Sequence, residues 1–432
     1  MSPRVRKLLS SALILAGAAF AQTPPKLTLP DAVALAIKNH PQIQAAQHEV
    51  NFAQQQVVIN RAPYYPAVSG DITGSQGNDL ARIGAGTLTA SRLFDRFGQG
   101  LELSQLVTDS GRTPNLVASA RLQARASEQT LQATRYDVVL AVDRSYYEVL
   151  HAQAVVRVAE QTVSARQLLS DQVTELTKNK LKSQLDQSFA EVQVSQAKLL
   201  LIRAQEAVQS SLAELGRALG SDQPANYQLE ESPLPPGPAD KPDDLVTQAI
   251  ANRPELASLR YTRESAYKFY EAEKDLRRPT VSIAAVGGFI PYINTTANTP
   301  IPAEYEGVAA NVNIPVFNGH LFSARREAAH EHALESDQHL RDQQQQVSRD
   351  VRVAWTGTVT AYQRMDVTAQ FLRQAALSLD LARGRYNLGL SSIVELTQAQ
   401  LNLTQAEIEN LGAKYDYQTQ YAVLQFTIGA LR

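Results

Sequence analysis

The chain of 432 residues contains no cysteine, two methionines and one tryptophan. Without cysteine there is no disulfide framework, no thiolate metal site, no cysteine nucleophile and no cysteine to carry a lipid anchor. An excess of basic residues is also missing, because 41 Lys and Arg stand against 43 Asp and Glu, which argues against a nucleic-acid binder. No apolar run approaches the ~20 residues of a membrane-spanning helix. The composition by itself is that of a polar, soluble protein.

The first 21 residues have the pattern of a secretory signal peptide. Arg4, Arg6 and Lys7 precede a short apolar run, Leu8–Phe20, and an Ala-Phe-Ala ending closes at Ala21. A basic start, an apolar stretch and small residues at the cleavage site predict export with cleavage after Ala21. The alternative is a buried N-terminal helix. The protein is therefore predicted to be exported and, without cysteine, not to be retained by an acyl chain.

The rest of the sequence contains an internal repeat. Residues from Asp31 onward match those from Asp244 onward at a constant offset of 213. After a variable stretch the offset becomes 209 and holds as far as the pair Gly220 and Gly429. A fixed register over so many residues predicts a tandem duplication.

The repeat predicts the domain organisation. The first structural repeat occupies residues 22–220 and the second 244–432, and a proline-rich linker, 221–243, joins them. Prolines exclude helix in the linker and favour an extended chain. Each repeat is predicted to run helix, strand, strand, long helix, helix.

The helices are predicted to be unusually long. Residues 113–178 and 320–387 contain almost no helix breaker, and 181–219 and 390–428 follow them as the final helices. A 66-residue helix extends ~99 Å. Apolar residues recur every seven positions in the last helix, which favours supercoiled helix pairs. An ordinary soluble bundle, with shorter helices and broader apolar stripes, is the alternative.

Four short segments alternate apolar and small or polar residues with a period of two. They are predicted to be strands at about 66–75, 98–108, 279–289 and 305–316. Each has about the length of a tilted membrane strand, and aromatic residues lie near the ends, as in an interfacial girdle. Soluble hairpins packed on the helices are the alternative.

Strand pairing decides between these two interpretations. Four strands cannot close a barrel, because the smallest membrane barrels have ~8 strands. An open sheet edge in lipid would leave backbone groups without partners. The chain must therefore associate, and three copies would supply twelve strands.

Several motifs together resemble the outer-membrane efflux protein (TolC-like) family over Leu27–Leu431. They are the opening segment Leu27–Ala36 with the Asn39–Pro41 triplet after it, the junction Val316–Gly319, and the closing segment Arg385–Ser392. The resemblance implies a mainly α fold with a small β part. Each chain would contribute long α-helical barrel or coiled-coil helices and one third of a twelve-stranded transmembrane β-barrel in a homotrimer.

The resemblance also implies a function. The trimer would be the passive exit duct of a tripartite efflux or type I secretion system, in the outer membrane and extending into the periplasm. Its partners would be a periplasmic adaptor (membrane fusion) protein, an inner-membrane transporter and outer-membrane lipid. It would need no cofactor or metal and would catalyse nothing.

By resemblance, the turn between the last two helices of each repeat is the periplasmic tip that contacts the adaptor. The matching positions are Lys180, Leu181, Ser183, Gly389, Leu390 and Ser392. Gly389 can adopt the positive φ that reverses a chain after a helix. Lys180 stands where the other repeat has this glycine, which puts the geometry of the first turn in question.

The resemblance further implies a gate just above the tip, closed by contacts between helices and by a ring of carboxylates. The matching positions are Asp186, Tyr386, Ser391, Glu395 and Gln398. Tyr386 is predicted to donate its hydroxyl to Asp186. Glu395, repeated three times, is predicted to favour cations in the pore. The alternative for Glu395 is a solvated charge on a helix face.

Two departures from the family pattern weaken the predicted gate. Ser391 replaces an arginine and Gln398 replaces a second acid, so a looser latch and a single acidic ring are predicted.

Two other classes of protein remain as alternatives. The first is a soluble periplasmic coiled-coil scaffold or adaptor, which would not sediment with outer-membrane barrels. The second is a secreted enzyme, but the sequence contains no P-loop, nucleophile elbow or zinc-protease motif. His330, His332 and His339 fall on one predicted helix, but the first two do not share a face, which argues against a metal site.

Overall fold

The computed structural model describes residues 25–78, 95–238, 241–294 and 302–431. The predicted signal peptide lies outside these ranges. The chain divides into two compact units. Unit 1 comprises Met1–Pro41, Arg135–Pro242 and Arg352–Arg432, and unit 2 comprises Gln42–Thr134 and Asp243–Val351.

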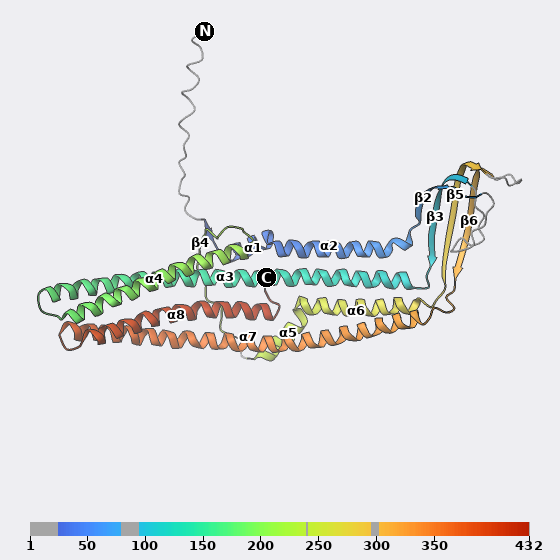
Figure 1. Ribbon diagram of the computed structural model, residues 1–432. Coiled ribbons are helices and arrows are strands. Elements are labelled where there is room, and N and C mark those ends of the chain that lie inside the picture. The colour runs from blue at the N-terminus through green and yellow to red at the C-terminus, as the bar shows by residue number, and fades with distance from the viewer. Residues whose placement is uncertain (1–24, 79–94, 239–240, 295–301, 432) are drawn as a thin grey trace, which may run out of the picture. The chain divides into compact units, whose positions relative to one another are not determined.

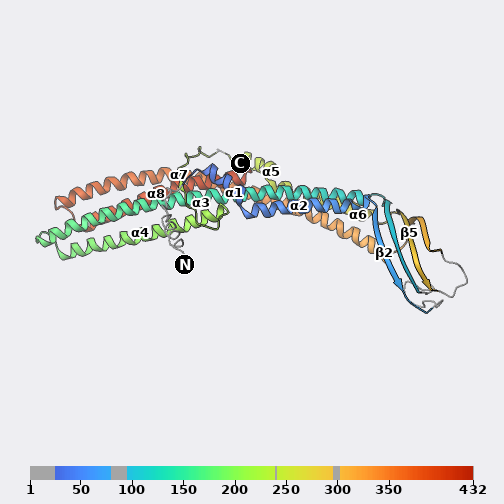
Figure 2. The ribbon, with the colours of Figure 1, turned by 90° about the horizontal axis from the view of Figure 1, so that it is seen from above.

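Unit 2 contains a four-stranded antiparallel sheet in the order β2-β3-β5-β6 (Figures 1 and 2). The strands are β2 (Ala67–Ser75), β3 (Asp95–Thr108), β5 (Thr280–Asn294) and β6 (Glu304–Asn313). All four predicted strands are therefore confirmed. The predicted end of the last strand, at residue 316, was wrong. β6 ends two residues before Pro315, which has no N–H to donate to a ladder.

The apolar residues of the four strands lie on one face of this sheet. Register pairs Val68 with Leu103, Leu103 with Ala285, and Ala285 with Val308, which makes one continuous cross-strand row. The neighbouring row, one residue along, belongs to the opposite face and contains Ser69, Glu102, Val286 and Gly307. The face containing Val308 is not covered by other elements, since Val68, Leu101 and Val308 are 64%, 63% and 80% exposed.

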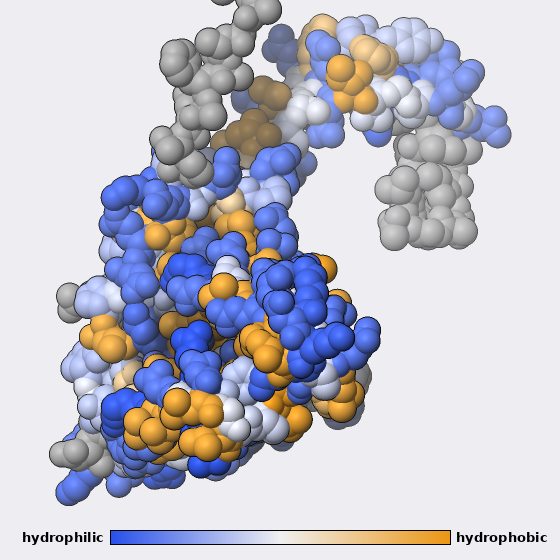
Figure 3. All heavy atoms as spheres, turned by 90° about the vertical axis from the view of Figure 1, so that its left-hand side faces the viewer, coloured by the Kyte–Doolittle hydropathy of each residue, from blue (hydrophilic) through white to orange (hydrophobic). Residues whose placement is uncertain are grey.

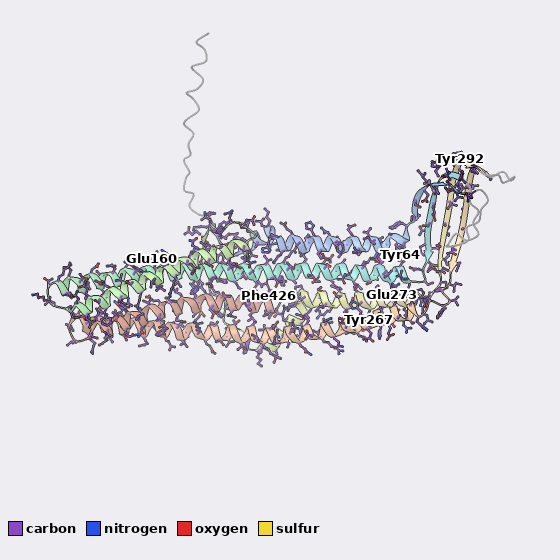
Figure 4. All side chains as sticks on the ribbon, in the orientation of Figure 1. Tyr64, Glu160, Tyr267, Glu273, Tyr292 and Phe426 are labelled. Atoms are coloured by element: carbon purple, nitrogen blue, oxygen red, sulfur yellow. The ribbon has the colours of Figure 1, made fainter. Side chains whose placement is uncertain are left out.

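Aromatic side chains lie at both ends of the sheet. Tyr64 lies at the end next to the helices, and Tyr292 lies at the far end (Figure 4). Phe97 pairs with Tyr292 across the β3–β5 ladder, and Tyr305 lies one strand further along, opposite Gly288. These rings are all at least 40% exposed, as interfacial aromatics would be.

Helices α2 (Pro41–Arg61), α5 (Pro242–Asn252) and α6 (Pro254–Asp275) belong wholly or largely to unit 2. The N-terminal parts of α3 (Arg112–Lys178), up to Thr134, and of α7 (Leu321–Asn387), up to Val351, complete it. Proline at the start of α2 and α6 is well placed, because the first helical N–H groups have no partner within the helix. The Asn39–Pro41 triplet thus separates α1 from the longer α2, and the matching residues 252–254 separate α5 from the longer α6.

Buried charges join the helices just below the sheet. Glu273 of α6, only 1% exposed, faces Arg325 of α7 at 2.7 Å and Arg112 of α3 at 3.6 Å (Figure 4). Two residues further on, buried Asp275 pairs with Arg278 at 3.0 Å. A buried carboxylate needs such partners, and here they fix the three helices where β5 begins.

Unit 1 contains α1 (Leu29–Asn39), α4 (Gln184–Ala218), α8 (Ile393–Thr427) and the C-terminal parts of α3, from Arg135, and α7, from Arg352. α4 returns along α3, and α8 returns along α7 (Figure 1). Helices α3 and α7 have 67 residues each, and α4 and α8 have 35 each. The predicted helix limits are confirmed to within about three residues. None of the helices in the described part of the chain has an apolar stretch sufficient to cross a membrane.

The proline-rich linker is held against the helices of unit 1. Its strand β4 (Gln228–Leu229) pairs in parallel with β1 (Lys26–Leu27). The hydroxyl of Tyr146 on α3 donates to the carbonyl oxygen of Glu230 at 2.6 Å, and Lys414 on α8 pairs with Glu231 at 2.8 Å. From Ala225 to Pro236 the segment is extended, as its prolines predict, and contacts unit 1 at several points. The predicted linker end at 243 was wrong, because α5 already begins at Pro242.

Candidate functional site

The turns between α3 and α4 and between α7 and α8 have the same backbone geometry. Lys180 has a φ of 60° and Gly389 a φ of 72°. In the first turn the N–H of Leu181 donates to the carbonyl oxygen of Leu176, and in the second the N–H of Leu390 donates to that of Arg385. Both are Schellman motifs, which usually place glycine at the left-handed position. The lysine therefore adopts the conformation of the glycine that it replaces.

Serine begins the helix after each turn. Ser183 caps α4 and accepts from the N–H of Asp186 at 3.1 Å, while the Asp186 carboxylate accepts from the N–H and hydroxyl of Ser183 at 3.1 and 2.8 Å. Ser392 caps α8 and accepts from the N–H of Glu395 at 3.4 Å. Two predicted tip residues thus act locally as N-caps.

Tyr386 lies in a small apolar core to which four helices contribute. The core consists of Leu169, Val173, Ala190, Ala382, Tyr386, Ile393, Leu396 and Ala399. These residues come from α3, α4, α7 and α8, so the core joins the two helical hairpins of the chain. Tyr386 is only 7% exposed, and burial, together with the Asp186 carboxylate nearby, raises the pKa of its hydroxyl.

The hydrogen bond predicted from Tyr386 to Asp186 is not formed. The Tyr386 hydroxyl is buried without a hydrogen-bond partner among the described residues, and so is the hydroxyl of Ser391. Asp186 is instead engaged by Ser183. The prediction did not take into account that an acid three residues after a serine N-cap competes for the same carboxylate.

Lys182 provides a contact between the two hairpins that the sequence did not reveal. Its ammonium nitrogen lies 4.3 Å from the centroid of the Tyr386 ring, which is within the range of a cation–π interaction. Lys182 precedes α4 and Tyr386 belongs to the last turn of α7, so the contact joins the turns.

Glu395 forms an ion pair within its own chain. Its carboxylate lies 3.1 Å from Nε of Arg385, which also donates to the Leu390 carbonyl oxygen at 3.4 Å. Both members of the pair, and Gln398 one turn further along α8, line a shallow groove between α7 and α8. Gln398 donates to Asn402 at 3.0 Å. Arg385 was not predicted as a site residue, although it lies within the closing motif.

Leucine side chains project from both turns. Leu181, Leu388 and Leu390 are 69%, 76% and 66% exposed. Figure 3 views the molecule from the end at which the turns lie and shows hydrophobic residues in orange among hydrophilic ones. Exposed apolar groups beside cationic ones are typical of a protein-binding surface.

The histidines of α7 do not form a common site. His332 and His339 both contact the exposed carboxylate of Glu335, at 3.0 and 3.5 Å, while His330 packs on the Tyr270 ring at 5.1 Å. The ligand atoms of Glu327, His330 and Glu331 lie within 4.8 Å of one another. Both of these glutamates are exposed, as on many helices that bind no metal.

Family comparison identifies the class of protein that this fold and these turns define. The family described as outer membrane efflux protein matches residues 32–221 and 245–430. The chain belongs to this family.

Individual relatives match over nearly the whole length. The chain is 22% identical over 430 residues to the outer membrane efflux protein BepC of Brucella suis, covering 98% of this chain and 90% of BepC. It is 25% identical to the alkaline protease secretion protein AprF of Pseudomonas aeruginosa, covering 94% and 85%. Among solved structures, the CmeC outer membrane channel of Campylobacter jejuni has a TM-score of 0.79 at 16% identity, covering 93% and 85%.

Membership of this family establishes the role of the protein. It is an outer-membrane channel of the tripartite efflux and secretion systems, in a family made of transport channels, and it extends into the periplasm. The alternative of a soluble periplasmic scaffold or adaptor is not supported.

Proposed function

We propose that the protein works as a homotrimer whose sheets join into one twelve-stranded barrel. What supports this is the pair of free edges on its sheet. Among the described strands, β2 and β6 are each hydrogen-bonded on one side only. A lipid-facing sheet must satisfy these backbone groups, and three copies joined edge to edge satisfy them all.

The partners of the duct are a periplasmic adaptor and an inner-membrane transporter. The surface proposed for the adaptor consists of the two Schellman turns, where Leu181 and Leu390 are exposed and Lys180 adds a positive charge. The duct itself is passive and catalyses no reaction.

The gate is proposed at the same turns and includes Asp186, Tyr386, Ser391, Glu395 and Gln398. The ion pair changes what Glu395 would do there. With Arg385 held at 3.1 Å, each copy presents a neutral pair rather than a bare carboxylate, so the three copies would form a ring of alternating charge. Cation preference at the tip is therefore weaker than a ring of unpaired carboxylates would give.

Two substitutions test this gate, one that removes the negative charge of the pair and one that removes the positive charge. Glu395→Gln leaves Arg385 without its partner, and Arg385→Gln leaves Glu395 without its partner. The reversal potential in a salt gradient should move toward anion selectivity in the first variant and toward cation selectivity in the second. Identical reversal potentials in both variants and the native channel would exclude the pair from the pore.

A further inference from the structure

We propose that Tyr386 holds the two tip turns together through its ring, with Lys182 as the partner, and not through its hydroxyl. This inference rests on the proposed gate and names the contact that keeps it closed. Lys182 is thereby a positioning residue for the closed state.

First, the Tyr386 hydroxyl and the Asp186 carboxylate, which were predicted to form a hydrogen bond, do not bond to each other. The Tyr386 hydroxyl is buried and has no hydrogen-bond partner in the described part of the chain, while the Asp186 carboxylate accepts two bonds from Ser183. A buried hydroxyl without a partner lowers the stability of the state that buries it, because it has lost its hydrogen bonds to water. The hydroxyl therefore opposes closure, or at best contributes nothing to it.

The second step is the ring. Its faces and edges pack in the four-helix core beside Val173, Ala190 and Ile393, and the Lys182 ammonium lies over it at 4.3 Å. Lys182 is half-buried, and partial removal from water strengthens a cation–π interaction. The attraction needs only the π-face, which phenylalanine also supplies.

The third step is connectivity. Lys182 is attached to the α3–α4 hairpin and Tyr386 to the α7–α8 hairpin. When the hairpins separate, as opening at this end requires, the ammonium must leave the ring and the hydroxyl regains water. Opening therefore costs the cation–π attraction of the ring but restores the hydration of the hydroxyl, so the ring favours the closed state and the hydroxyl favours the open state.

The test is single-channel conductance of the full-length trimer in planar lipid bilayers. Lys182→Met keeps the length of the side chain and removes the charge, so conductance should rise several-fold. Lys182→Arg should restore the native value, because guanidinium also binds aromatic faces. Lys198→Met is the matched control, an exposed lysine of α4 for which no ring contact is found in the described chain, and it should conduct like the native channel.

Tyr386→Phe separates the two modes of holding the gate. If the ring holds it, Tyr386→Phe has native or lower conductance, whereas a hydroxyl-held gate predicts a rise. Tyr386→Leu, which removes the aromatic face, should conduct several-fold more than native. Each variant is first confirmed as a heat-modifiable trimer.

Two results overturn the inference: higher conductance in Tyr386→Phe, or native conductance in Lys182→Met. Failure of the native protein to form any channel would instead overturn the proposed function, so the two failures are distinguishable.

Discussion

At the scale of single residues, Asp143 on α3 has a consequence for stability. It is only 6% exposed, and burial raises its pKa from 3.8 to about 7. Between these two values the folded chain retains a proton that the unfolded chain has released. The free energy of unfolding should therefore fall as pH rises from about 4 to about 7 and then level off, by at most about 1.4 kcal/mol per pH unit.

The variant Asp143→Asn tests this directly, because the amide is neutral at every pH. Its unfolding, followed by denaturant titration in detergent from pH 4 to 8, should lack the part of the slope that Asp143 contributes. Asp171→Asn, an exposed position on the same helix, is the control and should keep the native slope. Equal slopes in the native protein and Asp143→Asn would show that this carboxyl is not held neutral.

The gate shows where sequence reasoning stops at this scale. The positions of Tyr386, Glu395 and Ser392 follow from motifs, and Ser392 could be assigned as a cap from its spacing to Glu395 alone. The partners could not be predicted, because Lys182 and Tyr386 are 204 positions apart in the numbering and meet only after both hairpins have packed. At Lys180 the local sequence was misleading instead of silent. Local sequence argued against its φ of 60°, yet the flanking helices impose it, at a cost of about 1–2 kcal/mol.

At the scale of elements, the helices and strands were largely predictable. After Pro114 in its first turn, α3 contains no Gly or Pro, so its 67 residues have a strong local pattern and were predicted to within one or two positions. Strand ends were less well predicted. β5 continues to Asn294, five residues past the predicted end, because its ladder with β3 extends to Asp95. Pairing across strands that are far apart in sequence sets such limits.

The faces of the sheet yield a prediction from two adjacent positions of β6. Val308→Lys puts a charge on the apolar face, in the row of Val68, Leu103 and Ala285, and should cost about 2–4 kcal/mol if that face meets the hydrocarbon core. Ala309→Lys puts the same charge on the opposite face.

The readout is the amount of heat-modifiable protein in the outer-membrane fraction. Val308→Lys should reduce it strongly, while Ala309→Lys should remain near the native amount. Equal loss in both variants would mean that neither face is specifically lipid-facing.

At the scale of the whole molecule, the repeat remains a prediction that the element lengths favour. Helices α1 and α5 have 11 residues each, as α3 matches α7 and α4 matches α8. We propose that a tandem duplication produced both halves. What the sequence could not predict is the division into two compact units, since each unit draws segments from both repeats.

The central claim is that one chain has too little sheet to close a barrel and completes it with two identical neighbours. The most direct test is the mass of the particle extracted from outer membranes in detergent, measured by native mass spectrometry. The account predicts three chains per particle. A single folded chain, stable in buffer without detergent, would contradict it.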